Sequence, residues 1–210
     1  MERELDANVH LAKKSVVTDT IFKVNSILNS SGFVLGDSST LLLYDPDMEM
    51  DFDIEPAKGI DNVIRRLSSW PLLGIVSYEY ENFLVDVSFR KYKERESIHC
   101  VSISFPEELY RTKKALKDIK SLVVKLHEKL GAIRTVSDID IEGDSSGYDI
   151  DNEVTLLADK KIEGEYWLDI LNENYFDLNK EMIKSKPGLM VKELQDNLLL
   201  EREKEYIAGE

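Results

Sequence analysis

The chain has 210 residues, of which 42% are hydrophobic and 32% are charged, enough for one large domain with a real core. Acidic residues outnumber basic ones, 41 against 27, which gives a formal net charge of −14. This charge repels phosphate backbones and anionic lipid headgroups, so it argues against binding to DNA and to membranes. It would attract a basic protein or divalent cations, or simply keep the protein soluble.

The single cysteine, Cys100, excludes an intrachain disulfide and favours a reducing compartment. No apolar stretch approaches the length of a transmembrane helix, and the first residues, Met1-Glu2-Arg3-Glu4, do not resemble a secretory signal. We therefore expect a cytoplasmic protein.

Helices and strands are expected to alternate in the first part of the chain. Apolar residues at helical spacing predict a helix over 5–30, followed by a short strand at 33–36. Residues 45–55 alternate strictly between acidic and apolar, which predicts a strand with one acidic face. The acidic positions are Asp45, Asp47, Glu49, Asp51, Asp53 and Glu55.

The middle of the chain gives clearer signals. A helix is predicted from Gly59 to Trp70, and three strands follow at roughly 72–80, 83–91 and 97–105. Glu81-Asn82 is expected to form the hairpin between the first two strands. The longest helix begins at Pro106 and ends at Gly131.

The last third of the chain is expected to be a separate helical region. An acidic, turn-rich linker at 137–153 would join an α+β domain of residues 1–136 to helices within 154–210, although both could belong to one domain. Short helices are expected at 166–171 and 191–205. The predicted fold class is therefore α+β: a mixed or antiparallel sheet of about five strands, helices largely on one face, and C-terminal helices.

Three carboxylates give the best chemical lead. Asp51 and Asp53 are two residues apart on one predicted strand, so their side chains point the same way. Asp86 lies in Leu84-Val85-Asp86-Val87, where an acid among apolar residues is costly unless it faces something. If the two strands are neighbours, the carboxylates converge into a site suited to Mg²⁺ or Mn²⁺. Otherwise the acids of 45–55 are solvated, and Asp86 pairs with an Arg or Lys.

The order of these elements resembles the DNA-polymerase-β-like nucleotidyltransferase superfamily over residues 5–90. That family has a Gly-Ser or Gly-Gly turn before a strand with an acid-apolar-acid motif, and a third acid on a later strand. The resemblance implies that Asp51, Asp53 and Asp86 hold metal and that Asp86 also deprotonates the acceptor. It further implies that Gly36 and Ser38 lie beside the phosphates of a nucleotide. The chain departs from the pattern at Asp37, where an acid would repel a triphosphate.

The first functional hypothesis is thus a metal-dependent nucleotidyltransferase-like protein that transfers a nucleotide to an unknown acceptor. The alternative is a non-catalytic acidic binding protein, such as a bacterial immunity protein that neutralises a basic protein toxin. Net charge, small size and the lack of a recognisable nucleophile–base pair favour the alternative. A third hypothesis is a structural or regulatory subunit that docks through its C-terminal helices. Whether the protein is an enzyme stays open at this stage.

Three further patterns allow two interpretations each. Aromatic residues near the hairpin could anchor a basic partner or belong to the core; they are Trp70, Tyr78, Tyr80, Phe83 and Tyr92. Residues 138–149 could form a Ca²⁺ loop, but an acidic surface loop is favoured. His127 lies among charged residues of the longest helix, so we expect it to be exposed.

Overall fold

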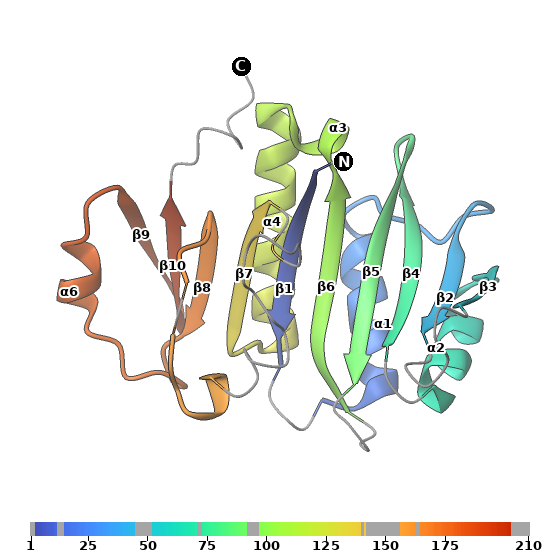
Figure 1. The fold of residues 1–210 in the computed structure, drawn as a ribbon, viewed down its shortest axis with the longest axis horizontal. Helices are drawn as coiled ribbons and strands as arrows, with labels where there is room; N and C mark the ends of the chain where they lie inside the picture. Colours follow the sequence, from blue (N-terminus) through green and yellow to red (C-terminus); the bar gives the residue numbers. More distant parts are fainter. Residues whose placement is uncertain are drawn as a thin grey trace.

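The computed structural model describes residues 3–11, 15–44, 52–70, 73–91, 97–139, 141, 156–162 and 164–202. Within these residues, ten antiparallel strands form one continuous sheet in the order β3-β2-β4-β5-β6-β1-β7-β8-β10-β9 (Figure 1). The strands are β1 (Glu4–His10), β2 (Thr40–Tyr44), β3 (Phe52–Pro56), β4 (Leu73–Tyr80), β5 (Phe83–Lys91), β6 (Ile98–Pro106), β7 (Arg134–Ile139), β8 (Leu168–Asn172), β9 (Leu189–Leu194) and β10 (Asn197–Arg202). The helices are α1 (Val17–Asn29), α2 (Ile60–Ser69), α3 (Glu107–Tyr110), α4 (Lys113–Leu130) and α6 (Lys180–Lys184).

The predicted fold class is wrong, because the sheet has ten strands rather than about five and the C-terminal part adds strands to it. At the N-terminal end, β1 replaces the first part of the helix predicted over 5–30 and pairs with β6 and β7 near the middle of the sheet. At the C-terminal end, β8, β9 and β10 occupy positions for which helices were predicted. Strands β7, β8, β10 and β9 therefore extend the same sheet that the earlier strands begin.

Helices α1, α2 and α4 lie behind the sheet as seen in Figure 1, and their apolar side chains form one core with the strands. The longest helix, α4, begins where the Thr112 hydroxyl accepts a hydrogen bond from the Ala115 amide, at 3.2 Å. It ends at Gly131, whose φ of +63° is the left-handed conformation that glycine adopts most easily. None of the described helices is long and apolar enough to cross a membrane.

The prediction that His127 is exposed is wrong. The imidazole points from α4 into the sheet and is almost fully buried. Its Nδ1 lies 2.8 Å from Thr135 Oγ1 on β7, and its Nε2 lies 3.0 Å from Asn197 Oδ1 on β10. Burial lowers the pKa of His127 to about 4, so the ring is neutral near pH 7 and joins α4 to two strands by hydrogen bonds.

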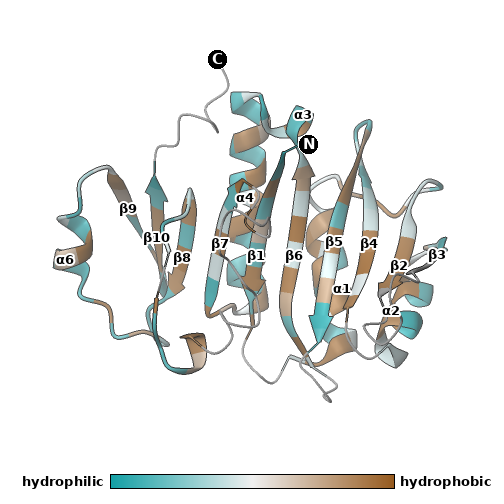
Figure 2. Ribbon diagram, viewed as in Figure 1, coloured by the Kyte–Doolittle hydropathy of each residue, from teal (hydrophilic) through white to brown (hydrophobic). Residues whose placement is uncertain are grey.

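The opposite side of the sheet, which we call the open face, divides into two halves. In β4 and β5, buried residues alternate with partly or fully exposed ones, as expected for a sheet covered on one side. Figure 2 shows hydrophobic and hydrophilic segments along the same strand, β5. In β1, β6, β7 and β8, nearly every residue is buried, so both sides are covered. We call the part formed by β4 and β5, with the neighbouring β2 and β3, the exposed half of the open face. The part formed by β1, β6, β7 and β8 is its buried half.

Candidate functional site

The strand order separates two of the three carboxylates predicted to bind metal. Asp51 lies outside the described residues, Asp53 belongs to β3, and Asp86 belongs to β5. Strands β2 and β4 run between β3 and β5, which places β3 and β5 about 14 Å apart at the usual strand spacing. The neighbouring strands that a site shared by Asp53 and Asp86 would need are therefore not found.

Asp86 is exposed on the open face and takes part in a short chain of hydrogen bonds. The Ser77 hydroxyl on β4 donates to Asp86 Oδ1 at 2.6 Å, and Ser77 Oγ lies 3.2 Å from Thr40 Oγ1 on β2. No described Arg or Lys forms a salt bridge with it. Solvent and one hydroxyl thus satisfy the carboxylate, although its neighbours in sequence are apolar.

The turn predicted to hold phosphates instead lies against a carboxylate of its own chain. The Ser38 amide donates to Glu79 Oε1 at 2.6 Å, and the Gly36 amide donates to Ser39 Oγ at 3.0 Å. A Cβ at Gly36 would meet the end of the Glu79 side chain, so the carboxylate would have to move if a larger residue stood there. The backbone N–H group of Ser38 that could face an anion is already used by Glu79.

A metal site is not apparent in the described part of the chain, where no group of three or more His, Cys, Asp or Glu side chains could hold an ion. The suggested Ca²⁺ loop lies mostly outside the described residues. Within them, the Asp138 carboxylate accepts hydrogen bonds from the amides of Ile139 and Trp167, at 2.9 and 3.1 Å. Binding of Mg²⁺, Mn²⁺ or a nucleotide stays a prediction.

A different group of residues gathers on the exposed half of the open face. Apolar side chains from four neighbouring strands lie on it: Leu42, Ile54, Ile75 and Leu84. Ile54 is 67% exposed and Leu84 is 48% exposed, which is unusual for large apolar residues in the middle of strands. We call this set, together with Asp86, the acidic sheet patch.

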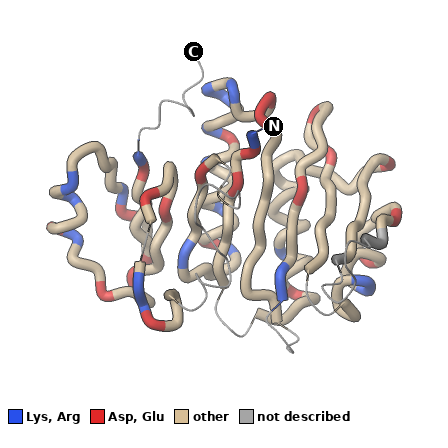
Figure 3. The backbone as a smooth tube through the Cα atoms, in the orientation of Figure 1, with Lys and Arg blue, Asp and Glu red and all other residues tan. Residues whose placement is uncertain are grey.

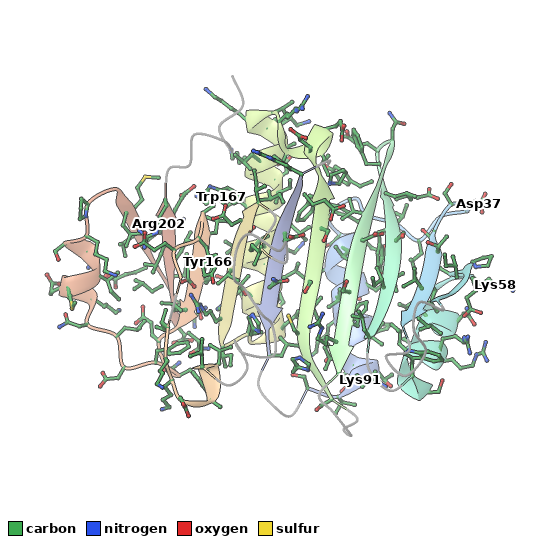
Figure 4. The ribbon with its side chains drawn as sticks, in the orientation of Figure 1. Asp37, Lys58, Lys91, Tyr166, Trp167 and Arg202 are labelled. Carbon is green, nitrogen blue, oxygen red and sulfur yellow. The ribbon has the colours of Figure 1, made fainter. Side chains whose placement is uncertain are left out.

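More carboxylates border the acidic sheet patch at the β4–β5 hairpin and the turn before β2. They are Asp37, Glu79 and Glu81. Figure 3 shows red, acidic segments at the β4–β5 hairpin. Neither these three nor Asp86 forms a salt bridge with a described Lys or Arg. Lys58 and Asp37 both lie beside the β2–β3 edge of the sheet in Figure 4, so the border there carries charges of both signs.

The aromatic residues near the hairpin belong mainly to the core. Tyr78 is fully buried and its hydroxyl donates to Asn25 Oδ1 at 3.3 Å, while burial raises its pKa. Tyr80 stacks on Phe33 with ring centroids 4.2 Å apart, and Trp70 and Phe83 are partly buried. Tyr92 lies outside the described residues. The acidic sheet patch therefore owes its apolar surface to aliphatic side chains.

The buried half of the open face holds a polar cluster that the sequence analysis missed. Arg134 on β7 and Asp169 on β8 form a bidentate ion pair at 3.0 and 2.8 Å, and the guanidinium lies 5.4 Å from the Tyr166 ring centroid. Beside them, Asp6, Asn8 and His10 share one side of β1. Their alternation with Leu5, Ala7 and Val9 was the signal that could have revealed this strand.

Two members of this cluster are fully enclosed. Burial, then the charges of Arg134, His99 and Arg90, lowers the pKa of His10 to about 3. Asn8 is wholly buried, and neither atom of its side-chain amide has a hydrogen-bond partner in the described part of the chain. The cluster is therefore shielded from solvent: His10 is neutral near pH 7, and the charge of Arg134 is paired with that of Asp169 inside the protein.

Comparison with known proteins identifies a similar fold and no family. No family model matches the chain, and no curated protein matches it. A solved structure described as Pseudomonas aeruginosa T6SS protein PA0821 is similar in fold, with a TM-score of 0.52 and 12% sequence identity. The similarity covers 95% of this chain but only 65% of that protein. At this identity the likeness concerns the fold alone.

Proposed function

We propose that the protein is a non-catalytic binding protein whose acidic sheet patch docks a basic protein, in the manner of a bacterial immunity protein that neutralises a toxin. The observation that carries this proposal is the exposure of Ile54 and Leu84 on a sheet face beside carboxylates that lack a cationic partner among the described residues. Apolar contacts would supply affinity, and the carboxylates would select a cationic surface.

The arrangement suits a protein surface better than a small molecule. The patch spans four neighbouring, hydrogen-bonded strands, so it offers a broad platform. A Lys or Arg placed over Asp86 would replace water on a carboxylate that Ser77 already holds in position. The net charge of −14 would also speed the approach of a basic partner at low salt.

The fold-level likeness to a T6SS protein is compatible with a role in a bacterial toxin system. The nucleotidyltransferase hypothesis gains no comparable support, because β3 and β5 are not neighbours and Glu79 occupies the Ser38 amide. The proposal therefore uses Asp86 as a docking carboxylate rather than as a metal ligand or base.

The test begins with the proteins encoded beside this one in its genome. Each basic candidate is purified, and its affinity for this protein is measured by calorimetry from low to high salt. We expect one candidate to bind with an affinity that falls steeply as salt rises, and to lose its toxicity when this protein is co-expressed.

Variants locate the contact. Leu84→Asp and Asp86→Lys should each weaken binding by at least about 10-fold if the patch is the docking surface. The matched control is Met182→Asp, which places the same charge at an apolar residue that is 64% exposed on α6. Equal losses from Leu84→Asp and Met182→Asp, or a neutralising effect that survives Asp86→Lys, would refute the role of the patch.

A further inference from the structure

A groove lies on the helix side of the sheet, between α4 and the edge strand β9. It has a volume of about 550 Å³. We call it the lysine groove and define it by Lys117, Lys120 and Val124 of α4 with Met190, Lys192 and Leu194 of β9. Helix α4 lies behind the sheet in Figure 1, so the groove is on the side opposite the acidic sheet patch.

The groove exists because the sheet extends beyond its helical cover. Helix α4 packs on β1 and β7, and no described helix lies behind β10 and β9 (Figure 1). The register places Lys192 opposite Leu199 and Met190 opposite Glu201, and Glu201 pairs with Lys120 of α4. The helix side of β9 and β10 thus forms the floor of the groove, and α4 forms its wall.

The floor exposes apolar surface that is large for an uncovered strand. Met190 is 60% exposed, while Leu194 and Val124 are partly exposed on either side of the groove. Met190 is flexible and polarisable, so it adapts to an apolar partner at little cost. A helix lying beside α4 at the usual separation of about 8 to 10 Å would cover all three side chains.

The charge of the groove is opposite to that of the protein. Helix α4 carries six lysines and only two acids, Asp118 and Glu128, within a chain whose net charge is −14. At the groove, Lys117 and Lys192 are exposed and form no salt bridge with a described residue, while Lys120 is neutralised by Glu201. Two cations that have no described salt-bridge partner therefore lie at the groove: Lys117 on α4, and Lys192 between Met190 and Leu194 on β9.

We propose that the lysine groove binds an acidic amphipathic helix of a partner protein. The apolar stripe of that helix would lie on Met190, Leu194 and Val124. Its Asp or Glu side chains would reach Lys117 on one side and Lys192 on the other. The lysines at the groove favour an acidic helix, although the net charge of the whole chain favours basic ligands. A preference for an acidic peptide would therefore be specific to the lysine groove.

The proposal can be tested with a pair of designed peptides. Each matches α4 in its length of 18 residues and carries Leu at helical spacing. One peptide has Glu at the flanking positions and the other has Lys. Fluorescence anisotropy measures binding of each labelled peptide to the whole protein. We expect the Glu peptide to bind more tightly than the Lys peptide by at least about 5-fold at moderate salt.

Methyl NMR then locates the bound peptide. The Glu peptide should shift the signals of Met190, Leu194 and Leu199, and should leave those of Leu84 and Met182 unchanged. Met190→Asp should weaken binding of the Glu peptide by about 10-fold, because it places an anion on the apolar floor. Lys117→Glu combined with Lys192→Glu should reverse the preference between the two peptides.

Matched controls separate the groove from general charge effects. Met182→Asp changes an equally exposed methionine on α6, and Lys58→Glu changes a lysine far from the groove; neither should alter binding by more than about 2-fold. Thermal unfolding of every variant verifies that it is folded. Failure of the Glu peptide to bind, a preference for the Lys peptide, or NMR shifts confined to other surfaces would overturn the proposal. Concentration-dependent dimerisation lost in Met190→Asp would overturn it too, by identifying a second copy of the chain as the occupant.

Discussion

The two halves of the open face belong to one sheet and carry similar polar residues, yet they treat charge differently. In the buried half, Arg134 is matched to Asp169, and Asp6 accepts a hydrogen bond from Ser104 at 2.7 Å. In the exposed half, Asp86 accepts a hydrogen bond from the Ser77 hydroxyl and forms no salt bridge with a described Lys or Arg. Burial makes partners obligatory, because an unmatched charge away from water is costly. Only the exposed half can exchange water for the cations of another protein.

The largest expected effect comes from breaking the ion pair in the buried half. Asp169→Ala should lower the free energy of unfolding by about 3 to 5 kcal/mol, because it removes a carboxylate that accepts two hydrogen bonds from the buried Arg134 guanidinium. Urea titration measures the loss. Replacing both partners, Arg134→Leu with Asp169→Leu, should cost much less than Asp169→Ala alone. An equal or greater loss in the double variant would show that the pair contributes more than mutual neutralisation.

The pH dependence of stability tests the same half through His10. Its pKa is about 3 in the folded protein, against about 6.5 for an unperturbed histidine, so the unfolded chain binds the proton more readily between these values. His10 therefore lowers stability as pH falls below about 6.5, by about 2 kcal/mol at pH 5 relative to neutral pH.

Two measurements isolate this contribution from the acid groups. The free energy of unfolding of His10→Gln should change less between pH 7 and 5 than that of the natural chain, by about 2 kcal/mol. In addition, the ring proton signals of His10 should not titrate above pH 5 in NMR spectra. A titration centred near pH 6.5 would contradict the burial of the ring.

Substitution of Asn8 should change the free energy of unfolding by a smaller amount and in the opposite direction. Its buried amide has no partner among the described residues, and it lies between Ser102 and Val136 in the sheet register. Asn8→Val removes the unmatched polar atoms and suits a strand, so it should raise the free energy of unfolding by about 1 kcal/mol. Thermal and urea unfolding measure the gain, with Ser102→Val as the comparison. A loss above about 1 kcal/mol would show that the amide is hydrogen-bonded in solution, for example by internal water.

The sequence was sufficient for the elements whose hydrophobic pattern is local. Strands β4, β5 and β6, the hairpin at Glu81-Asn82, and helix α2 lie close to their predicted positions, and α4 ends at Gly131 as expected. In β4 and β5 one side faces solvent, so alternation is visible. The left-handed conformations at Glu81 and Gly131 lie where the turn and the helix end were expected.

Elements buried on both sides gave no such pattern. Leu198, Leu199 and Leu200 in β10 are all buried, and a short run of apolar residues of this kind does not distinguish strand from helix. Strand β1 was predicted to be the first part of a helix, but the helix begins later, at Val17. His127 was misjudged because its partner Asn197 is 70 residues away in the chain.

The proposed metal site depended on long-range topology, which the sequence left open. Acid spacing within a strand can be recognised, but the insertion of β2 and β4 between Asp53 and Asp86 cannot be deduced from either strand alone. The acidic sheet patch was also out of reach, because it needs the register that brings Ile54, Ile75 and Leu84 onto one face. Composition alone showed only that the chain is acidic, which favours a basic partner.

The smallest effect on the free energy of unfolding is expected from substitution of Asp86. It can be compared directly with the large effect expected from substitution of Asp169. Asp86→Asn keeps the shape and the hydrogen bond from Ser77 while removing the charge, so the free energy of unfolding should change by less than about 0.5 kcal/mol. If the patch docks a basic protein, the same variant should slow association and flatten its salt dependence, as stopped-flow kinetics would show. One carboxylate would then affect binding without affecting folding, and the other folding without binding. A stability loss at Asp86 comparable to that of Asp169→Ala would contradict this division, because it would mean that the exposed half also requires its charge in order to fold.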